Sequence, residues 1–299
     1  FGFYVYGTLP LFIVRYLAEW LEYTGYGEVY LVGRYASATV DMLTVFLVFL
    51  VSYRLYRDKR LSVLATAFSA CAVMQIQISH YFTVDNFTTF FSTLTLYFAV
   101  WVMTAVPQEE DISRKKTSAE QIGETEAIES AHDVEAGSGR REHPGDQIGA
   151  EGITWWTWLN RSWSSVLPYI MFGLALGLSM ASKVNAAPLA LLLPAAAYFY
   201  YQKHIADNEG FRGRQDGEVI IIIRNLVIAA FISFVIFRIF QPYAFDGPGF
   251  FNINLNPKWV STMEDIRAQS AGDVDFPPAL QWARRPLWFA WDNMVRWGM

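Results

Sequence analysis

Long apolar stretches alternate with short polar junctions along most of this 299-residue chain. Residues 30–53, 61–79, 87–106 and 219–240 each form an apolar stretch with few charges. A helix that rises 1.5 Å per residue needs about 20 residues to cross the hydrocarbon of a bilayer. Residues 163–202 form a stretch about twice that length, which predicts two helices joined by a hairpin. The pattern therefore predicts an all-α polytopic membrane protein with about six spans.

The two ends of the chain differ from this pattern. Residues 5–22 are apolar but are interrupted by Gly, Pro, Arg and Glu, which is typical of an amphipathic helix at the membrane interface. We expect residues 1–106 to form the first part of the bundle, with this segment and three spans, and residues 155–243 to form the second part, with three more. Residues 244–299 are polar, aromatic and rich in Pro, which indicates an extracytoplasmic loop on the membrane surface that leads into further spans.

Charge predicts how the chain is oriented. The first strong span ends in a basic cluster of three Arg and one Lys between positions 54 and 60, which the positive-inside rule places in the cytoplasm. Residues 107–154 hold 12 acidic and 5 basic residues, and this net charge of −7 leaves +2 on the remainder of a chain whose total is −5. Their composition predicts an acidic, disordered cytoplasmic loop. The junction at residues 79–86 then faces the extracytoplasmic side, and the rest of the chain has no basic patch suited to nucleic acid.

The junction between the second and third spans, "SHYFTVDN", gathers polar side chains between two apolar stretches. Ionisable groups near membrane depth are costly and by default indicate function. Asp85 is a candidate catalytic carboxylate, and its structural alternative is to cap a helix that begins at Phe87. His80 is a weaker candidate, since it is also suited to a polar contact at the interface. The single cysteine, Cys71, excludes an intramolecular disulfide and is expected to be a small packing residue.

Three further ionisable groups lie within or beside the spans. Lys183 falls between the two helices predicted for residues 163–202, where an ammonium group can bind a phosphate or form an ion pair with Asp41. Arg34 lies near the outer surface and suits phosphate binding or snorkelling. Together these residues describe an outward-facing site with a carboxylate for base catalysis or metal binding, cations for a phosphate, and an aromatic loop for sugar rings.

Several segments resemble glycosyltransferase family 39, the dolichyl-phosphate-mannose–protein mannosyltransferase-like group, and particularly its bacterial members. The segments that carry the resemblance are "YGTLPLFIVRYLAEW", "VYLVGRYASATVDMLTVFLVFLVSYRLY", "IQISHYFTVDNFTTFFSTLTLYFAV", "GLALGLSMASKVNAAPLALLLP" and "QPYAFDGPGFFNINLNPKW". The resemblance implies a GT-C-type helix bundle in the plasma membrane. It implies transfer of a hexose, mannose-like, from a polyprenyl-phosphate carrier to a protein, lipid or glycan acceptor. Transfer is expected on the extracytoplasmic face, with inversion.

The resemblance also assigns roles to individual residues. The family's principal catalytic Asp or Glu lies in its first external loop, which we expect upstream of Phe1, so that this chain is an N-terminally truncated fragment. Asp85 matches a second catalytic aspartate, and Lys183, with Arg34, is expected to bind the donor phosphate. His80 and Tyr81 are expected to contact the substrate. The cofactor is unknown, and a divalent metal is one option that the resemblance leaves open.

Two other classes of protein account for parts of the same pattern. A transporter or flippase of lipid-linked sugars would explain the embedded charges and the aromatic loop without any catalysis. A structural subunit of a membrane complex would explain residues 107–154 as a docking segment.

Overall fold

The computed structural model describes residues 6–105, 155–203, 212–247, 249–273, 285–286 and 288–297, so the acidic loop predicted at 107–154 lies outside the described residues. The helices are α1 Leu9–Trp20, α2 Tyr26–Tyr56, α3 Lys59–Ala70, α4 Val73–Ser79, α5 Val84–Met103, α7 Trp155–Ser182, η1 Val184–Leu191, α8 Leu192–Tyr201, α9 Arg212–Phe240, η3 Pro242–Ala244, α10 Pro257–Ala271 and α12 Phe289–Trp297. Within the described ranges the other regular feature is one antiparallel bridge between Phe245 and Leu255. The predicted all-α class is confirmed.

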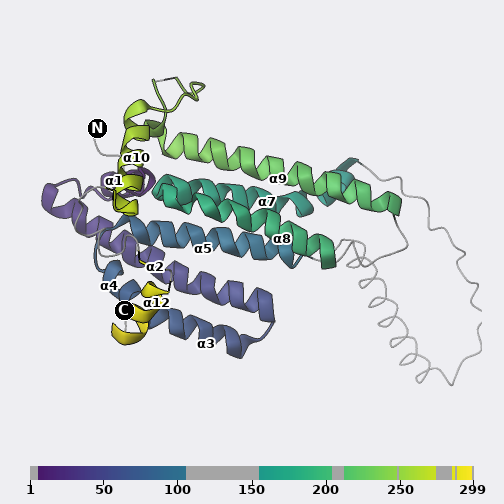
Figure 1. Ribbon diagram of the computed structural model, residues 1–299, viewed down its shortest axis with the longest axis horizontal. Coiled ribbons are helices and arrows are strands. Elements are labelled where there is room, and N and C mark those ends of the chain that lie inside the picture. The colour runs from purple at the N-terminus through teal and green to yellow at the C-terminus, as the bar shows by residue number, and fades with distance from the viewer. Residues whose placement is uncertain are drawn as a thin grey trace, which may run out of the picture.

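The long helices lie side by side in one bundle (Figure 1). In packing order they are α3, α2, α5, α7 and α9, with α8 against α5. Five of them are long and apolar enough to cross a membrane, or up to six if the bent pair α3 and α4 is one span, as predicted for a polytopic protein. These spans are Tyr26–Tyr56, Val84–Met103, Ser165–Ser182, Val184–Tyr201 and Val219–Phe240.

The span predicted at residues 61–79 is not one straight helix. The chain bends by 58° between α3 and α4, at Cys71 and Ala72, and the Cys71 side chain is exposed rather than packed. Beyond the bend, the Gln75 side-chain NH2 donates to the Asp41 carboxylate of α2 at 2.6 Å. Ser69, before the bend, donates to the side-chain oxygen of the same Gln75 at 3.4 Å, so both sides of the bend meet at this residue. The apolar pattern of residues 61–79 carries no information about a partner on another helix, so it could not predict the bend.

The stretch at residues 163–202 forms the predicted hairpin, with different boundaries. Its first helix, α7, begins earlier, at Trp155. The returning limb starts as the 3₁₀ helix η1 and continues as α8. Pro188 lies inside η1, where it cannot donate a backbone hydrogen bond and would clash with the carbonyl four residues earlier in an α-helix. The α-helical pattern therefore resumes only at Leu192.

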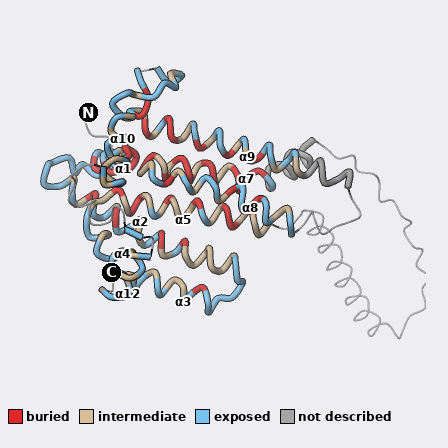
Figure 2. The backbone as a smooth tube through the Cα atoms, in the orientation of Figure 1, coloured by how far each residue is buried: buried red, intermediate tan, exposed pale blue. Residues whose placement is uncertain are grey.

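Small residues bring α7 and α9 into close contact. A Cβ atom on Gly173 would lie 2.5 Å from the Ala229 carbonyl oxygen, and one on Gly177 would lie 2.7 Å from the Ser233 carbonyl oxygen. This spacing of two glycines four residues apart is a common means of helix association in membranes. Figure 2 shows that the buried positions follow the inner sides of the central helices, while exposed positions lie on the outside. Many of the exposed side chains are large and apolar, as expected for a surface that contacts lipid.

One end of the bundle, which we call the Asp85 end, is closed by segments from distant parts of the chain. It carries the connection between α4 and α5, the break between α7 and η1, and the residues after α9 (Figure 1). Here the backbone amide of Gly7 donates to the carbonyl of Ser182 at 3.0 Å. The amide of Thr8 donates to the side-chain oxygen of Gln241 at 2.7 Å. The loop at residues 57–58, between α2 and α3, and the ends of α5 and α8 lie at the opposite end.

Candidate functional site

Asp85 lies in the first turn of α5, at the Asp85 end of the bundle. The helix begins at Val84 rather than at Phe87, and the residue before it, Thr83, has extended backbone. The expectation that Asp85 caps this helix is therefore wrong, since a capping side chain must precede the first turn. Its carboxylate still benefits from the positive end of the helix dipole, which favours an acid in the first turn.

Lys183 lies where α7 ends. The helix stops at Ser182, and Lys183 adopts an extended conformation, with φ −157° and ψ 119°, while its backbone amide still donates to the Ser179 carbonyl at 2.9 Å. The Ser179 hydroxyl also shares a 2.8 Å hydrogen bond with the Ser92 hydroxyl of α5. This contact joins the two helices close to the point where the lysine leaves α7, so the Lys183 side chain reaches toward α5.

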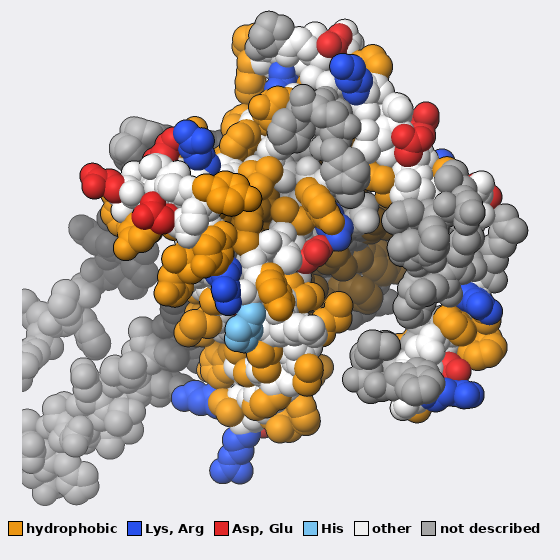
Figure 3. Space-filling model, turned by 90° about the vertical axis from the view of Figure 1, so that its left-hand side faces the viewer, with side chains coloured by type: hydrophobic (Ala, Val, Ile, Leu, Met, Phe, Trp, Pro, Cys, Tyr) orange, Lys and Arg blue, Asp and Glu red, His pale blue; other side chains and the backbone are white. Residues whose placement is uncertain are grey.

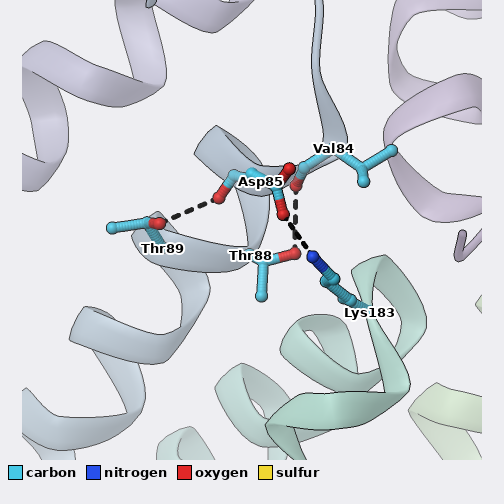
Figure 4. A network of polar contacts seen from close by, with 5 residues as sticks. All are labelled: Val84, Asp85, Thr88, Thr89 and Lys183. Atoms are coloured by element: carbon cyan, nitrogen blue, oxygen red, sulfur yellow. Dashed lines mark hydrogen bonds and ion pairs between the residues drawn. The ribbon is translucent and has the colours of Figure 1, made fainter. Parts of the chain in front are cut away.

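Asp85 and Lys183 form an ion pair between α5 and α7. Figure 4 shows the Lys183 ammonium pointing at the Asp85 carboxylate, with 2.6 Å between Nζ and Oδ1. The Lys183 side chain is 30% exposed and the Asp85 side chain is 45% exposed, so a ligand can reach both. The hydroxyls of Thr88 and Thr89 donate to the backbone carbonyls of Val84 and Asp85, and both lie beside the pair. An ammonium group has three donors, so Lys183 can hold Asp85 and a second anion at once.

The alternative that Lys183 pairs with Asp41 is wrong. Asp41 accepts instead from Gln75, at the bend between α3 and α4. Asp41 and Asp85 thus lie in separate polar contacts, because α5 rather than α2 lies next to the end of α7. Of these two acids, Asp85 is the one that pairs with a cation.

The other predicted site residues share the Asp85 end but do not meet the ion pair. His80 is exposed at the end of α4, with its Nδ1 2.7 Å from the Ile76 carbonyl oxygen, and Tyr81 is 62% exposed. Arg34 is exposed on α2, next to Gly33, whose missing side chain leaves room for the Phe82 ring. Among the described residues, no hydrogen bond or ion pair joins His80, Tyr81 or Arg34 to Asp85 or Lys183. Their proposed roles stay predictions.

Two buried polar residues of this end were missed by sequence reasoning. Thr8 and Gln241 are 3% and 4% exposed, and they are joined by two hydrogen bonds, while the Thr8 hydroxyl lies 2.6 Å from the Phe240 carbonyl oxygen. They hold the start of the described chain beside Ser182, the neighbour of Lys183. The sequence feature that could have indicated this contact is the amide side chain of Gln241 directly after the apolar stretch 219–240, a position suited to a structural hydrogen bond.

The face that carries the pair is mixed in character. Figure 3 shows scattered acidic and basic groups among apolar side chains, with a set-back apolar surface beside the charged groups at its centre. Across the described ranges, no three His, Cys, Asp or Glu side chains converge as metal ligands. Asp85 alone does not complete a divalent-metal site, so we assign no catalytic step to a metal.

The fold and this ion pair together define a polytopic helical membrane protein with an accessible carboxylate and ammonium at one end. Comparison with known families agrees with the resemblance seen in the sequence. Residues 7–120 match the family model described as dolichyl-phosphate-mannose-protein mannosyltransferase. The matched segment includes Arg34, His80, Tyr81 and Asp85 and ends before Lys183. The match supports a membrane glycosyltransferase of the mannosyltransferase type in general.

Neither the curated proteins nor the solved structures with which the chain was compared include a significant match.

Proposed function

We propose that this chain belongs to a membrane glycosyltransferase that moves a hexose, mannose-like, from a polyprenyl-phosphate carrier to a protein, lipid or glycan acceptor. The reaction takes place at the extracytoplasmic face of the plasma membrane, with inversion at the anomeric carbon. The observation that carries the proposal is the ion pair of Asp85 and Lys183 at one end of the bundle. The family match over residues 7–120 supports the reaction class.

In this reaction the oxygen of an acceptor hydroxyl attacks the anomeric carbon of the donor. The bond from that carbon to the phosphate oxygen breaks, and polyprenyl phosphate leaves with the electron pair. The Lys183 ammonium, with two donors not used by Asp85, binds the phosphate oxygens and stabilises the charge that develops there. The Asp85 carboxylate holds Lys183 in place and orients the acceptor hydroxyl, whose proton passes to the principal catalytic Asp or Glu that the family resemblance implies.

Arg34 is proposed as a second cation for the donor phosphate, and His80 and Tyr81 as contacts to the sugar or acceptor. All three are exposed, Arg34 on α2 and the other two between α4 and α5. A substrate that spans the distance from these residues to the ion pair would contact both, so we assign them a binding role and no chemical step.

The test uses the full-length protein in lipid vesicles with a panel of polyprenyl-phosphate sugars, and mass spectrometry follows release of free polyprenyl phosphate. We expect release with one donor, and its loss in Asp85→Asn. The matched control is Asp265→Asn, which removes an exposed carboxylate on α10 and should leave release unchanged. Normal turnover by Asp85→Asn would refute the role of this residue.

A transporter of lipid-linked sugars is the second candidate, because one span is broken. Bent or discontinuous helices with an ionisable group at the break are common in transporters, and α3 and α4 meet at a 58° bend beside the contact of Gln75 with Asp41. A transporter would move the intact donor between leaflets without releasing polyprenyl phosphate. The same vesicle experiment separates the two, since a fluorescent donor reports translocation and mass spectrometry reports cleavage.

A further inference from the structure

The segment that follows α9 folds into a short hairpin, which we call the 245–255 hairpin. Phe245 and Leu255 form an antiparallel bridge, and the amide of Asp246 donates to the Asn254 carbonyl at 2.8 Å. Gly247, with a φ of +76°, adopts a left-handed conformation that glycine tolerates readily. This element is therefore a defined turn of the chain with its own hydrogen bonds.

The base of the hairpin packs beside the last turns of α9 rather than beyond them. The Phe245 ring centroid lies 6.0 Å from that of Phe234 and 6.0 Å from that of Phe237. Phe234 precedes the end of the candidate span Val219–Phe240 by about 9 Å of helix, at 1.5 Å per residue. Figure 1 shows the hairpin next to this end of α9, on the flank away from α7. It thus lies beside the end of a candidate membrane span.

The hairpin covers a charge within that span. Arg238 is only 6% exposed, and one of its guanidinium nitrogens donates to the Gly249 carbonyl at 2.7 Å. Its guanidinium carbon also lies 4.7 Å from the Phe245 ring centroid and 5.6 Å from that of Phe250. An arginine in a span is costly unless protein groups surround it, and here a carbonyl and two aromatic faces do so.

The segment that returns from the turn, residues 251–256, is amphipathic. Its sequence, "FNINLN", alternates apolar and amide side chains, and where the backbone is extended a period of two places them on opposite sides of the chain. Phe251, Ile253 and Leu255 are 92%, 64% and 50% exposed. Two of the asparagine side chains bond within the hairpin region: the Asn252 side chain accepts from the backbone amide of Asn254, and the Asn256 side chain donates to the Tyr243 carbonyl at 3.2 Å.

We propose that the 245–255 hairpin is a membrane-interface anchor. Its apolar row contacts the lipid around the end of α9, and its base shields Arg238 from that lipid. Lipid is the occupant that the structure favours, because the hairpin packs on Phe234, which is itself 45% exposed on a candidate span. Three large apolar side chains in a row would otherwise meet water beside a membrane, with loss of the free energy of their burial.

The chain offers a direct test because Cys71 is its single cysteine. In a Cys71→Ser background, cysteines are introduced one at a time, labelled with a nitroxide, and measured in vesicles of phosphatidylcholine and phosphatidylglycerol. Power saturation compares accessibility to oxygen, which concentrates in lipid, with accessibility to a water-soluble nickel complex. The hairpin positions are Phe251, Asn252, Ile253 and Asn254; the lipid reference is Phe231 on α9, and the water reference is Glu264 on α10.

We expect the ratio of oxygen to nickel accessibility to alternate along the strand. Positions 251 and 253 should match the lipid reference, and positions 252 and 254 should have lower ratios. Nickel accessibility at 251 and 253 equal to that of the water reference would overturn the proposal. Low accessibility to both reagents would also overturn it, because the row would then be covered by protein. Neither outcome depends on whether the chain is a glycosyltransferase.

Discussion

Replacing Lys183 by Met removes the ammonium of the central ion pair and keeps most of the side chain's length. If Lys183 binds the donor phosphate, the variant should release polyprenyl phosphate roughly 100- to 1,000-fold more slowly, since that is the usual effect of losing one group that stabilises developing charge. This corresponds to about 2.7–4 kcal/mol in the activation free energy. The stability of the fold should change far less.

The structure gives the reason for this difference. The ion pair has good geometry, at 2.6 Å, but its side chains are 30% and 45% exposed. Exposed pairs typically contribute only about 0.2–1 kcal/mol to the free energy of unfolding, because solvation of the separated charges nearly offsets their attraction. The loss of an exposed ion pair is thus worth less than half of the predicted change in activation free energy, and the remainder is the contribution expected from phosphate binding.

The assay is a double-mutant cycle of Asp85→Asn and Lys183→Met, read by thermal unfolding in detergent and by polyprenyl-phosphate release in vesicles. The exchanged pair, Asp85→Lys with Lys183→Asp, is the decisive variant. It should recover the stability of the pair, yet remain inactive, because each charge then lies on the wrong helix for its substrate group. Recovery of turnover by the exchanged pair would refute the catalytic reasoning, as would a loss below about tenfold for Lys183→Met in a folded protein.

Three further predictions concern the fold. Gly177→Leu should lower stability by about 1–3 kcal/mol, since the added side chain meets α9. The control Gly27→Ala, whose added Cβ meets nothing within 4 Å, should be neutral or up to about 1 kcal/mol more stable. Thermal unfolding in detergent compares the two variants, and equal effects would contradict the close packing of α7 and α9. Gln241→Leu should cost about 1–3 kcal/mol, because the buried backbone amide of Thr8 loses its acceptor, while the Thr8 hydroxyl keeps the Phe240 carbonyl. Hydrogen exchange at Thr8 checks this change, and unchanged protection would contradict it. Asp58→Ala should cost about 1 kcal/mol, because Asp58 caps α3 by accepting from two backbone amides; unfolding measurements that show no loss would contradict that cap.

Much of the helical framework follows from local features of the chain. Runs of apolar residues long enough to cross a bilayer predicted the spans, and the break near Lys183 followed from one charge inside a long run. Asp58 and Pro188 determine a helix start and a change of helix type through their own backbone chemistry. These effects act within a few residues, so they can be recognised in the sequence without knowledge of which helices pack together.

The candidate site was predicted only in part. Asp85 and Lys183 were both singled out as ionisable groups next to apolar runs, but the sequence equally allowed Lys183 to pair with Asp41. The two residues that do pair are 98 positions apart. Which acid faces the lysine depends on how α2, α5 and α7 are ordered and rotated, and the charge pattern of one helix carries no information about the rotation of another.

Composition and periodicity were therefore sufficient for the class of protein, the positions of five candidate spans and the residues worth testing, because length, apolarity and backbone chemistry are properties of single segments. Contacts between segments required the folded chain. Gln75 binds Asp41 across 34 positions, next to the bend of a predicted span, and Gln241 binds Thr8 across 233 positions at the Asp85 end. Each depends on side chains that meet only when several helices have packed, since buried polar groups take their partners from whichever element lies beside them.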